Sequence, residues 1–409
     1  MESHNELKPV FNRRGAQSLA NISWWLLPLI TLPTYINAGQ TVVTPLAQLE
    51  TIYDDNIRLD NIPLEAYETT ASLGARSVYR TDASLLSGDF RWDNVSYQKG
   101  EGLDNRNDYK LKLRAREDYE RNTWQFDVIG IKDSTAKDIT IDNGADLPSD
   151  DEDIGGDVGF IRDDVTRNRY YLKPSWSYDL SEISEVGLSY KYSDLRYDDS
   201  RQHDLEDAFN HNVTVFYGFN TSEVNKVSPS IAVNHYESED AKNYDFLIGS
   251  VSNERTYGER FTSYASIGLY YVDAEKNTIS ETDTGSLYEL SGIYSLTSFS
   301  INVSAERTLA PGDFGNVVAK DRYMIGLIGE INPTWGYELG ALYYRNRAII
   351  KEIANSSRRY ATLRTSLYWH ITESVDLDFG YRFRKEKELT EADSNAIFVS
   401  VRYVNDFAM

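Results

Sequence analysis

The sequence predicts an all-β fold: a transmembrane, antiparallel, up-and-down β-barrel of about eighteen strands. Segments of roughly ten residues alternate apolar and polar side chains along most of the chain, as half-buried strands do. The connections between these segments are long and short in turn, which is how outer-membrane barrels arrange long external loops and short periplasmic turns. The N-terminus also carries the features of an export signal.

The composition is compatible with this fold and excludes several others. The chain has 409 residues, 64 acidic against 42 basic side chains, a net charge of -22 and no cysteine. The absence of cysteine excludes disulfides and cysteine-ligated zinc, and the acidity argues against binding nucleic acid, whose phosphates need a basic surface. No apolar run of about 20 residues follows the N-terminus, so a bundle of membrane helices is not expected.

Residues 1–38 are expected to be a cleaved signal peptide. Basic side chains precede an apolar stretch, which Pro28 and Pro33 interrupt and which the small residue Ala38 ends. An uncleaved membrane anchor is the alternative, but the apolar run is short for one. Residues 39–409 are then expected to form a single barrel domain in a bacterial outer membrane.

Eighteen segments carry the period-two pattern. Within residues 109–116, for example, one face has only apolar or aromatic side chains and the other only basic ones. A slip of one residue would exchange the two faces, so the register of such a strand is strongly specified. The predicted strands span 43–53, 66–79, 83–96, 108–118, 122–132, 167–179, 183–195, 209–220, 224–236, 243–254, 260–272, 285–296, 298–306, 321–332, 335–346, 358–370, 374–385 and 395–404.

The connections give the topology. An even number of antiparallel strands leaves both ends of the barrel on the periplasmic side, and the short connections are expected there as well. A soluble sandwich or propeller is the alternative. The chain has neither the linkers nor the repeat of fixed period that such folds would show. The long, external connections are predicted at 54–65, 97–107, 133–166, 196–208, 237–242, 273–284, 307–320, 347–357 and 386–394.

Aromatic residues on the apolar faces often stand towards strand ends, as in the interfacial girdles of membrane barrels. The longest connection, 133–166, is strongly acidic. One hypothesis is that it gates the mouth of the barrel, and another is that it binds Ca²⁺, although its spacing matches no calcium-loop pattern. A solvated acidic loop is the simpler interpretation.

The polar strand faces are often basic despite the acidic chain. Arginine and lysine lining a pore favour anions. The alternative is that these cations pair with carboxylates of the inner wall, such as Asp89, Asp376 and Asp378, and select nothing. The residues predicted to line the lumen and the substrate path are Arg76, Arg91, Lys110, Lys112, Arg114, Arg116, Arg167, Arg169, Lys173, Arg364, Arg382 and Arg384.

No catalytic residue, cofactor or metal site is expected. The five histidines have no metal-ligand spacing on one strand face, and no common hydrolase motif is present. An outer-membrane hydrolase would need a serine or aspartate near His203 or His211. The sequence therefore favours a channel over an enzyme.

Two short segments resemble outer-membrane barrels associated with exopolysaccharide gene clusters. Residues 44–57 (TPLAQLETIYDDNI) are similar to the opening of those proteins. Residues 306–318 (ERTLAPGDFGNVV) are similar to a late loop, but lack the serine that usually follows its proline.

The resemblance implies a porin that exports an exopolysaccharide, which the basic inner faces suggest is anionic, and it implies no catalytic residues. Tyr171 and Tyr368 are expected to stack on sugar rings. The expected partners are the polysaccharide, periplasmic export machinery, the barrel-assembly machinery, and outer-membrane lipid with lipopolysaccharide. A small-solute uptake porin for a sugar or organic anion, or a surface structural or adhesion barrel, are the alternatives.

Overall fold

The computed structural model describes residues 39–100, 102–135, 165–198, 205–239, 242–276, 279–312, 315–350, 357–387 and 391–408. The predicted signal peptide and almost all of the acidic loop 133–166 lie outside these residues, and so do the gate and Ca²⁺ hypotheses for that loop. Within the described part of the chain, no helix has the length and apolar character needed to span a bilayer.

Each of the eighteen predicted strands is present, and together they form one antiparallel sheet. A further strand of two residues, β19 (Phe407–Ala408), follows the last of them. The strands are β1 (Gln40–Asp54), β2 (Ala66–Arg80), β3 (Ser84–Gln98), β4 (Arg106–Asp118), β5 (Asn122–Ser134), β6 (Thr166–Ser181), β7 (Ser184–Tyr197), β8 (Ala208–Ser222), β9 (Asn225–Ser238), β10 (Lys242–Tyr257), β11 (Phe261–Lys276), β12 (Ile279–Ser295), β13 (Phe299–Pro311), β14 (Val317–Asn332), β15 (Trp335–Ala348), β16 (Ser357–Thr372), β17 (Val375–Lys387) and β18 (Glu391–Val404).

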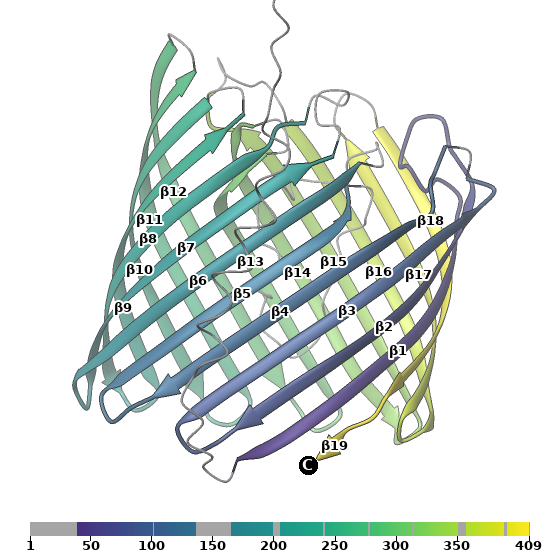
Figure 1. The fold of residues 1–409 in the computed structure, drawn as a ribbon, viewed down its shortest axis with the longest axis horizontal. Coiled ribbons are helices and arrows are strands. Elements are labelled where there is room, and N and C mark those ends of the chain that lie inside the picture. Colours follow the sequence, from purple (N-terminus) through teal and green to yellow (C-terminus); the bar gives the residue numbers. More distant parts are fainter. Residues whose placement is uncertain are drawn as a thin grey trace, which may run out of the picture. The chain divides into compact units, whose positions relative to one another are not determined.

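The sheet closes on itself between its first and last long strands. β1 pairs with β2 on one side and with β18 on the other, in a register that runs from Leu46 opposite Val404 to Asp54 opposite Ala396. Below that seam β19 continues the pairing with β1. Figure 1 shows the tilted strands wrapping around the barrel from purple β1 to yellow β18. The predicted closed, antiparallel, all-β barrel is therefore confirmed.

Several long connections are shorter than predicted. The segment 273–284 was expected to be a loop, but β11 and β12 continue through it to Lys276 and from Ile279. The outward face of this extension is polar: Asp273 and Thr282 are cross-strand partners on it, whereas Val272 and Ala274 on the inward face are buried in a hydrophobic cluster. Beyond the lipid the outward face of a strand contacts water, so the pattern of apolar residues outside and polar residues inside is lost there.

The outward face of the barrel is a band of exposed apolar side chains. Ile267, Leu269 and Ile231 are 69%, 70% and 61% exposed, and their inward neighbours along each strand are polar or less exposed. Tryptophans mark one edge of this band close to the short turns: Trp335 stacks on Trp369, with ring centroids 5.7 Å apart. Such a band with aromatic edges is the lipid-facing surface of a transmembrane barrel.

Candidate functional site

The candidate site is the inward face of the barrel, and every cation predicted to line the lumen lies on it. On β4, for example, Tyr109 and Leu111 are exposed on the outward face, so Lys110, Lys112 and the arginines that follow at the same spacing point inward. Most of the arginines have a carboxylate partner on the same wall. The pairs are Arg76–Asp89 (3.0 Å), Arg91–Asp93 (2.7 Å), Arg114–Asp127 (2.5 Å), Arg116–Asp118 (3.0 Å) and Arg364–Glu50 (3.3 Å).

Two further predicted cations belong to a buried cluster between β5 and β6. Asp133 lies 2.8 Å from the Arg167 guanidinium and 2.7 Å from that of Arg169, and all three side chains are almost inaccessible to solvent. These arginines hold the wall together and offer little surface to a passing solute. The lysines differ, because Lys110, Lys112 and Lys173 are half-buried, although each makes further polar contacts of its own.

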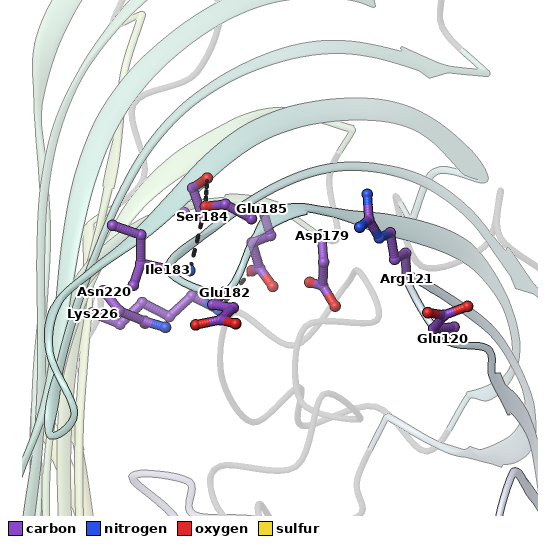
Figure 2. A pocket seen from close by; sticks show the side chains of 11 residues that line it. Glu120, Arg121, Asp179, Glu182, Ile183, Ser184, Glu185, Asn220 and Lys226 are labelled. Atoms are coloured by element: carbon purple, nitrogen blue, oxygen red, sulfur yellow. Dashed lines mark hydrogen bonds and ion pairs between the residues drawn. The ribbon is translucent and has the colours of Figure 1, made fainter.

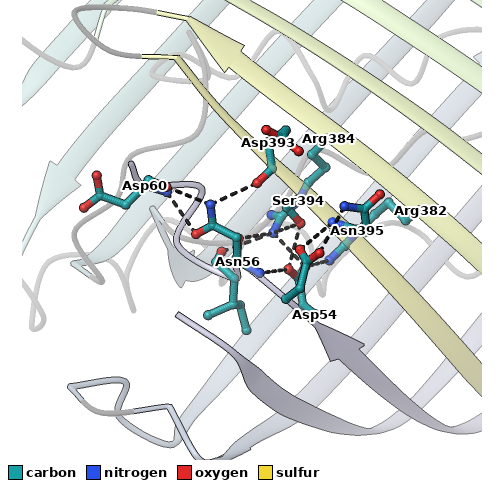
Figure 3. A network of polar contacts seen from close by, with 10 residues as sticks. Asp54, Asn56, Asp60, Arg382, Arg384, Asp393, Ser394 and Asn395 are labelled. Atoms are coloured by element: carbon teal, nitrogen blue, oxygen red, sulfur yellow. Dashed lines mark hydrogen bonds and ion pairs between the residues drawn. The ribbon is translucent and has the colours of Figure 1, made fainter. Parts of the chain in front are cut away.

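A second buried cluster lies across the seam where the barrel closes (Figure 3). Asp54, the last residue of β1, is fully buried and accepts hydrogen bonds from the guanidinium groups of Arg382 (3.0 Å) and Arg384 (2.8 Å) on β17. Ser394 on β18 donates to the other carboxylate oxygen at 2.7 Å. One carboxylate thus ties three consecutive strands together inside the barrel.

The residues after Asp54 fix the connection 55–65. The Asn56 side-chain amide donates to the backbone carbonyls of Asp60 (2.7 Å) and Asp393 (2.9 Å), as the dashed lines in Figure 3 show. Asp55 accepts hydrogen bonds from the backbone and side chain of Asn395. The connection is therefore folded into a defined shape at the end of the barrel that bears the long loops.

This connection lies inside the barrel. Leu59 adopts a positive φ of 50° and has no exposed surface. Its hydrophobic cluster consists of inward-facing residues of β14, β15, β16 and β18, whose outward neighbours Tyr323 and Tyr343 are exposed. The connection 55–65 therefore covers the inner wall on the side of β14 to β18. The members of this cluster are Leu59, Met324, Leu342, Tyr344, Tyr360 and Ala392.

A second segment also folds onto the inner wall. Val317 and Ile350, which flank long connections, pack against inward-facing aromatic residues of β9, β10 and β11 such as Tyr244. Gly315 has a positive φ of 66°, and a Cβ there would collide with the carboxylate of Glu206. Glu206 in turn pairs with the buried Lys242. The inner wall is thus covered on the side of β9 to β11 as well, at the end with the long loops.

The two tyrosines expected to stack on sugars differ in their exposure. Tyr171 does point inward, but only 3% of it is exposed and the Lys191 ammonium lies 5.3 Å from the centre of its ring. The stacking prediction for Tyr171 is therefore wrong, because the wall itself covers the ring. Tyr368 is half-buried, and its hydroxyl donates to the Gly329 carbonyl at 3.2 Å.

At the opposite end, the turns after β4, β6 and β8 surround an open pocket (Figure 2). Four of its eleven lining residues are acidic, among them Glu120, Asp179 and Glu182, and Lys226 pairs with Glu185 at 2.6 Å. The lining residues lie in the short turns predicted to be periplasmic and at the strand ends beside them. They form a polar rim.

Among the described residues, no group of three or more histidine and acidic side chains is arranged to hold a metal ion. His211 lies on the outward face beside Tyr190, whose hydroxyl is 2.7 Å from the ring nitrogen. His235 and His370 each contact an aspartate, Asp245 and Asp376. His203, which was named as a candidate position for a hydrolase, lies outside the described residues.

The buried carboxylates Asp54 and Asp133, and the inward-folded connection 55–65, were not singled out from the sequence. The run Tyr53-Asp54-Asp55-Asn56 was noticed only as part of a resemblance. The sequence signal for the inward-folded connection 55–65 was a pair of carboxylates at the end of an alternating strand, followed by asparagine.

The fold and its outward band define the class: a transmembrane β-barrel of the outer-membrane type. The sequence itself matches no known family profile and no curated protein. Several solved outer-membrane barrels are similar to it in fold. OccAB2 from Acinetobacter baumannii is 9% identical, with a TM-score of 0.44, over 92% of this chain and 100% of that one.

OpdK from Pseudomonas aeruginosa, solved with vanillate, is 8% identical with a TM-score of 0.47, over 90% of this chain and 99% of that one. The FrpB iron transporter from Neisseria meningitidis is 7% identical with a TM-score of 0.45, over 86% of this chain and 62% of that one. At these identities the likeness concerns the barrel alone and says nothing about cargo.

Proposed function

We propose that the protein is a passive outer-membrane channel for small polar solutes, with a preference for anions. The observation that carries this proposal is the connection 55–65, which lies against the inner wall and buries Leu59 there. A loop folded into the lumen restricts the cross-section, and restriction favours small solutes over a bulky polymer.

The preference for anions rests on the inner faces of β2 to β6. Their arginines are held by carboxylates such as Asp89 and Asp127, which keeps the guanidinium groups in place along the wall. Lys110, Lys112 and Lys173 add half-buried ammonium groups on flexible stems at the same wall. Several weak cationic contacts in succession lower the barrier for an anion without trapping it.

Planar-bilayer recordings test this proposal. Under a KCl gradient the protein should show a reversal potential of the sign expected for anion preference. The variant K110E/K112E/K173E should lose or invert that preference. The matched control is K132E, because Lys132 lies on the outward face of the neighbouring strand β5 and should leave the potential unchanged. A triple variant that retains the original reversal potential would remove this wall from the permeation path.

Export of an anionic exopolysaccharide is the second candidate, and the similarity of residues 44–57 to exopolysaccharide-associated barrels favours it. Within that stretch, however, Asp54 and Asn56 hold the seam and the inward-folded connection. A polymer would need the connection 55–65 to leave the wall. Liposome swelling separates the candidates. The small-solute channel is supported if monosaccharides and organic anions enter rapidly and oligosaccharides are excluded. A surface structural role is supported if the barrel lets no solute pass.

A further inference from the structure

An arginine patch lies on the outward face of the barrel, at the end that bears the long loops. It consists of Arg307 on β13, Arg345 and Arg347 on β15, and Arg359 on β16, gathered around Asp321 on β14. The register places these side chains in adjacent rows, because Arg307 is opposite Asp321, Asp321 opposite Arg345, and Arg345 opposite Arg359.

The outward direction of the patch follows from strand alternation. Tyr323 and Ile325 stand two and four residues after Asp321 on β14 and are 42% and 50% exposed. Tyr343, two residues before Arg345, is exposed in the same way. The ladder between β13 and β14 is continuous through this region, so no bulge turns the arginines inward.

Cations outnumber carboxylates in the patch. Asp321 is largely buried beneath Arg307 and Arg347, with its oxygens 2.5 Å and 3.3 Å from their guanidinium groups. Arg345 and Arg359 form no ion pair with any residue of the described ranges. The patch therefore has four guanidinium groups and one carboxylate, which pairs with two of them, on a chain whose net charge is -22.

The patch stands at the level of lipid headgroups. Directly next to it, the hydroxyls of Tyr288 and Tyr323 are 3.0 Å apart, and the Tyr323 and Tyr343 rings lie 6.1 Å apart. The Arg307 guanidinium lies 5.4 Å from the centre of the Tyr288 ring. Exposed tyrosines at the edge of an apolar band mark the boundary between hydrocarbon and headgroups.

The same end of the barrel is acidic elsewhere on its outward face. On β10 and β11, Asp245 and Asp273 are cross-strand partners on the outward face, with Leu247 and Tyr271 beside them. His235 provides the nearest partial counter-charge, at 2.7 Å from Asp245. The arginine patch is thus a local feature of β13 to β16 and not a general property of the rim.

We propose that the arginine patch binds the phosphate group of an outer-leaflet lipid. Guanidinium groups match phosphate oxygens with paired, parallel hydrogen bonds, and the surplus of guanidinium over carboxylate leaves donors for an anion. The tyrosines beside the patch provide the apolar surface on which the lipid chains of the same molecule would lie. Dissolved phosphate shares this chemistry but lacks the chains, which is why a lipid is the occupant that the site fits.

Spin-label electron paramagnetic resonance tests the assignment. The full chain is reconstituted into phosphatidylcholine vesicles that contain spin-labelled phosphatidic acid, or spin-labelled phosphatidylcholine for reference. The protein should associate with the phosphatidic acid preferentially. R307Q/R345Q/R347Q/R359Q should lose this preference, and R347Q alone should reduce it about fivefold, from the usual strength of one surface cation on an anionic lipid.

A control removes outward cations far from the patch, on β5, β7 and β10: K132Q/R196Q/R255Q should keep the preference. If the control loses the preference as fully as the patch variant, or if the patch variant keeps it, the proposal is overturned. Inorganic phosphate in the buffer should not compete, and complete competition would reassign the patch to dissolved anions and overturn the lipid assignment. Folded barrels migrate differently on gels with and without heating, so this shift identifies any variant that failed to fold. If the quadruple patch variant fails to fold, R345Q/R359Q replaces it, because this variant leaves the ion pairs of Asp321 intact. R345Q/R359Q must then show a partial loss of the preference for phosphatidic acid.

Discussion

The Asp54 carboxylate on β1 lies 2.8 Å from the Arg384 guanidinium on β17, although β18 stands between those two strands. Both side chains are almost completely buried. The contact therefore bridges the strand that closes the barrel, and it anchors the start of the inward-folded connection at the same point.

Asp54→Asn should destabilise the barrel by about 3–5 kcal/mol, because it leaves Arg382 and Arg384 buried beside a neutral amide. The measurement is the urea midpoint of the reconstituted protein, followed by tryptophan fluorescence. Glu391→Gln is the matched control, since its ion pair with Lys385 is half exposed and should leave the midpoint unchanged. Equal midpoints for wild type and Asp54→Asn would contradict a stabilising role for the seam cluster.

Replacing residues 57–63 by a glycine–serine linker should raise the single-channel conductance and admit larger sugars in liposome swelling. The replacement removes Leu59 from its cluster on β14 to β18 and uncovers that part of the inner wall. Asp54 and Asn56 are retained, so the seam stays closed. Unaltered conductance and an unaltered size limit would show that another part of the lumen sets the constriction.

Arg76 and Arg384 should respond differently to replacement by glutamine. The Arg76 side chain is 61% exposed to the lumen, so Arg76→Gln should weaken anion preference and change stability by less than about 1 kcal/mol. Arg384→Gln should instead lower the urea midpoint strongly, because Asp54 loses a buried partner. The urea midpoint and the reversal potential are measured on both variants, which separates cations that stabilise the wall from cations that contact permeating anions. If each variant changed both the midpoint and the reversal potential to the same extent, this division would be contradicted.

Gly380→Ala should destabilise the barrel by about 1–3 kcal/mol through overpacking. Gly380 lies on the inward face beneath the Phe398 ring, which a methyl group would displace. The Arg364 guanidinium lies only 4.0 Å from the centre of that ring, so its pair with Glu50 should loosen too. Gly249→Ala is the control, because a Cβ there meets no atom within 4 Å and the midpoint should not fall.

The strands were predictable because each reads as an alternating segment. Tyr109 to Arg116 shows why: apolar and basic side chains separate completely onto two faces, and lipid on one side imposes that separation. The same logic placed the lumen cations on the inward face. It failed above the lipid, where the outward face of β11 and β12 is polar, as at Asp273 opposite Thr282.

The site itself was less predictable. Which carboxylate meets which guanidinium depends on the closing register, so Asp54 and Arg384 could not be paired from positions 330 residues apart in the sequence. The burial of Leu59 depends on four strands that come together only in the closed barrel. The likeness of residues 44–57 to exopolysaccharide-associated barrels stays a prediction, but the contacts of Asp54 and Asn56 give this segment a structural role.

The position of the connection 55–65 constrains the order in which the chain can be assembled. It belongs to the first hairpin, but its apolar residue packs against strands made near the end of the chain. Leu59 can therefore reach its buried position only where β14, β15, β16 and β18 are already in place, so its burial depends on contacts far apart in the sequence. The pairing of β1 with β18, which brings Asp54 to Arg384, depends on equally distant contacts.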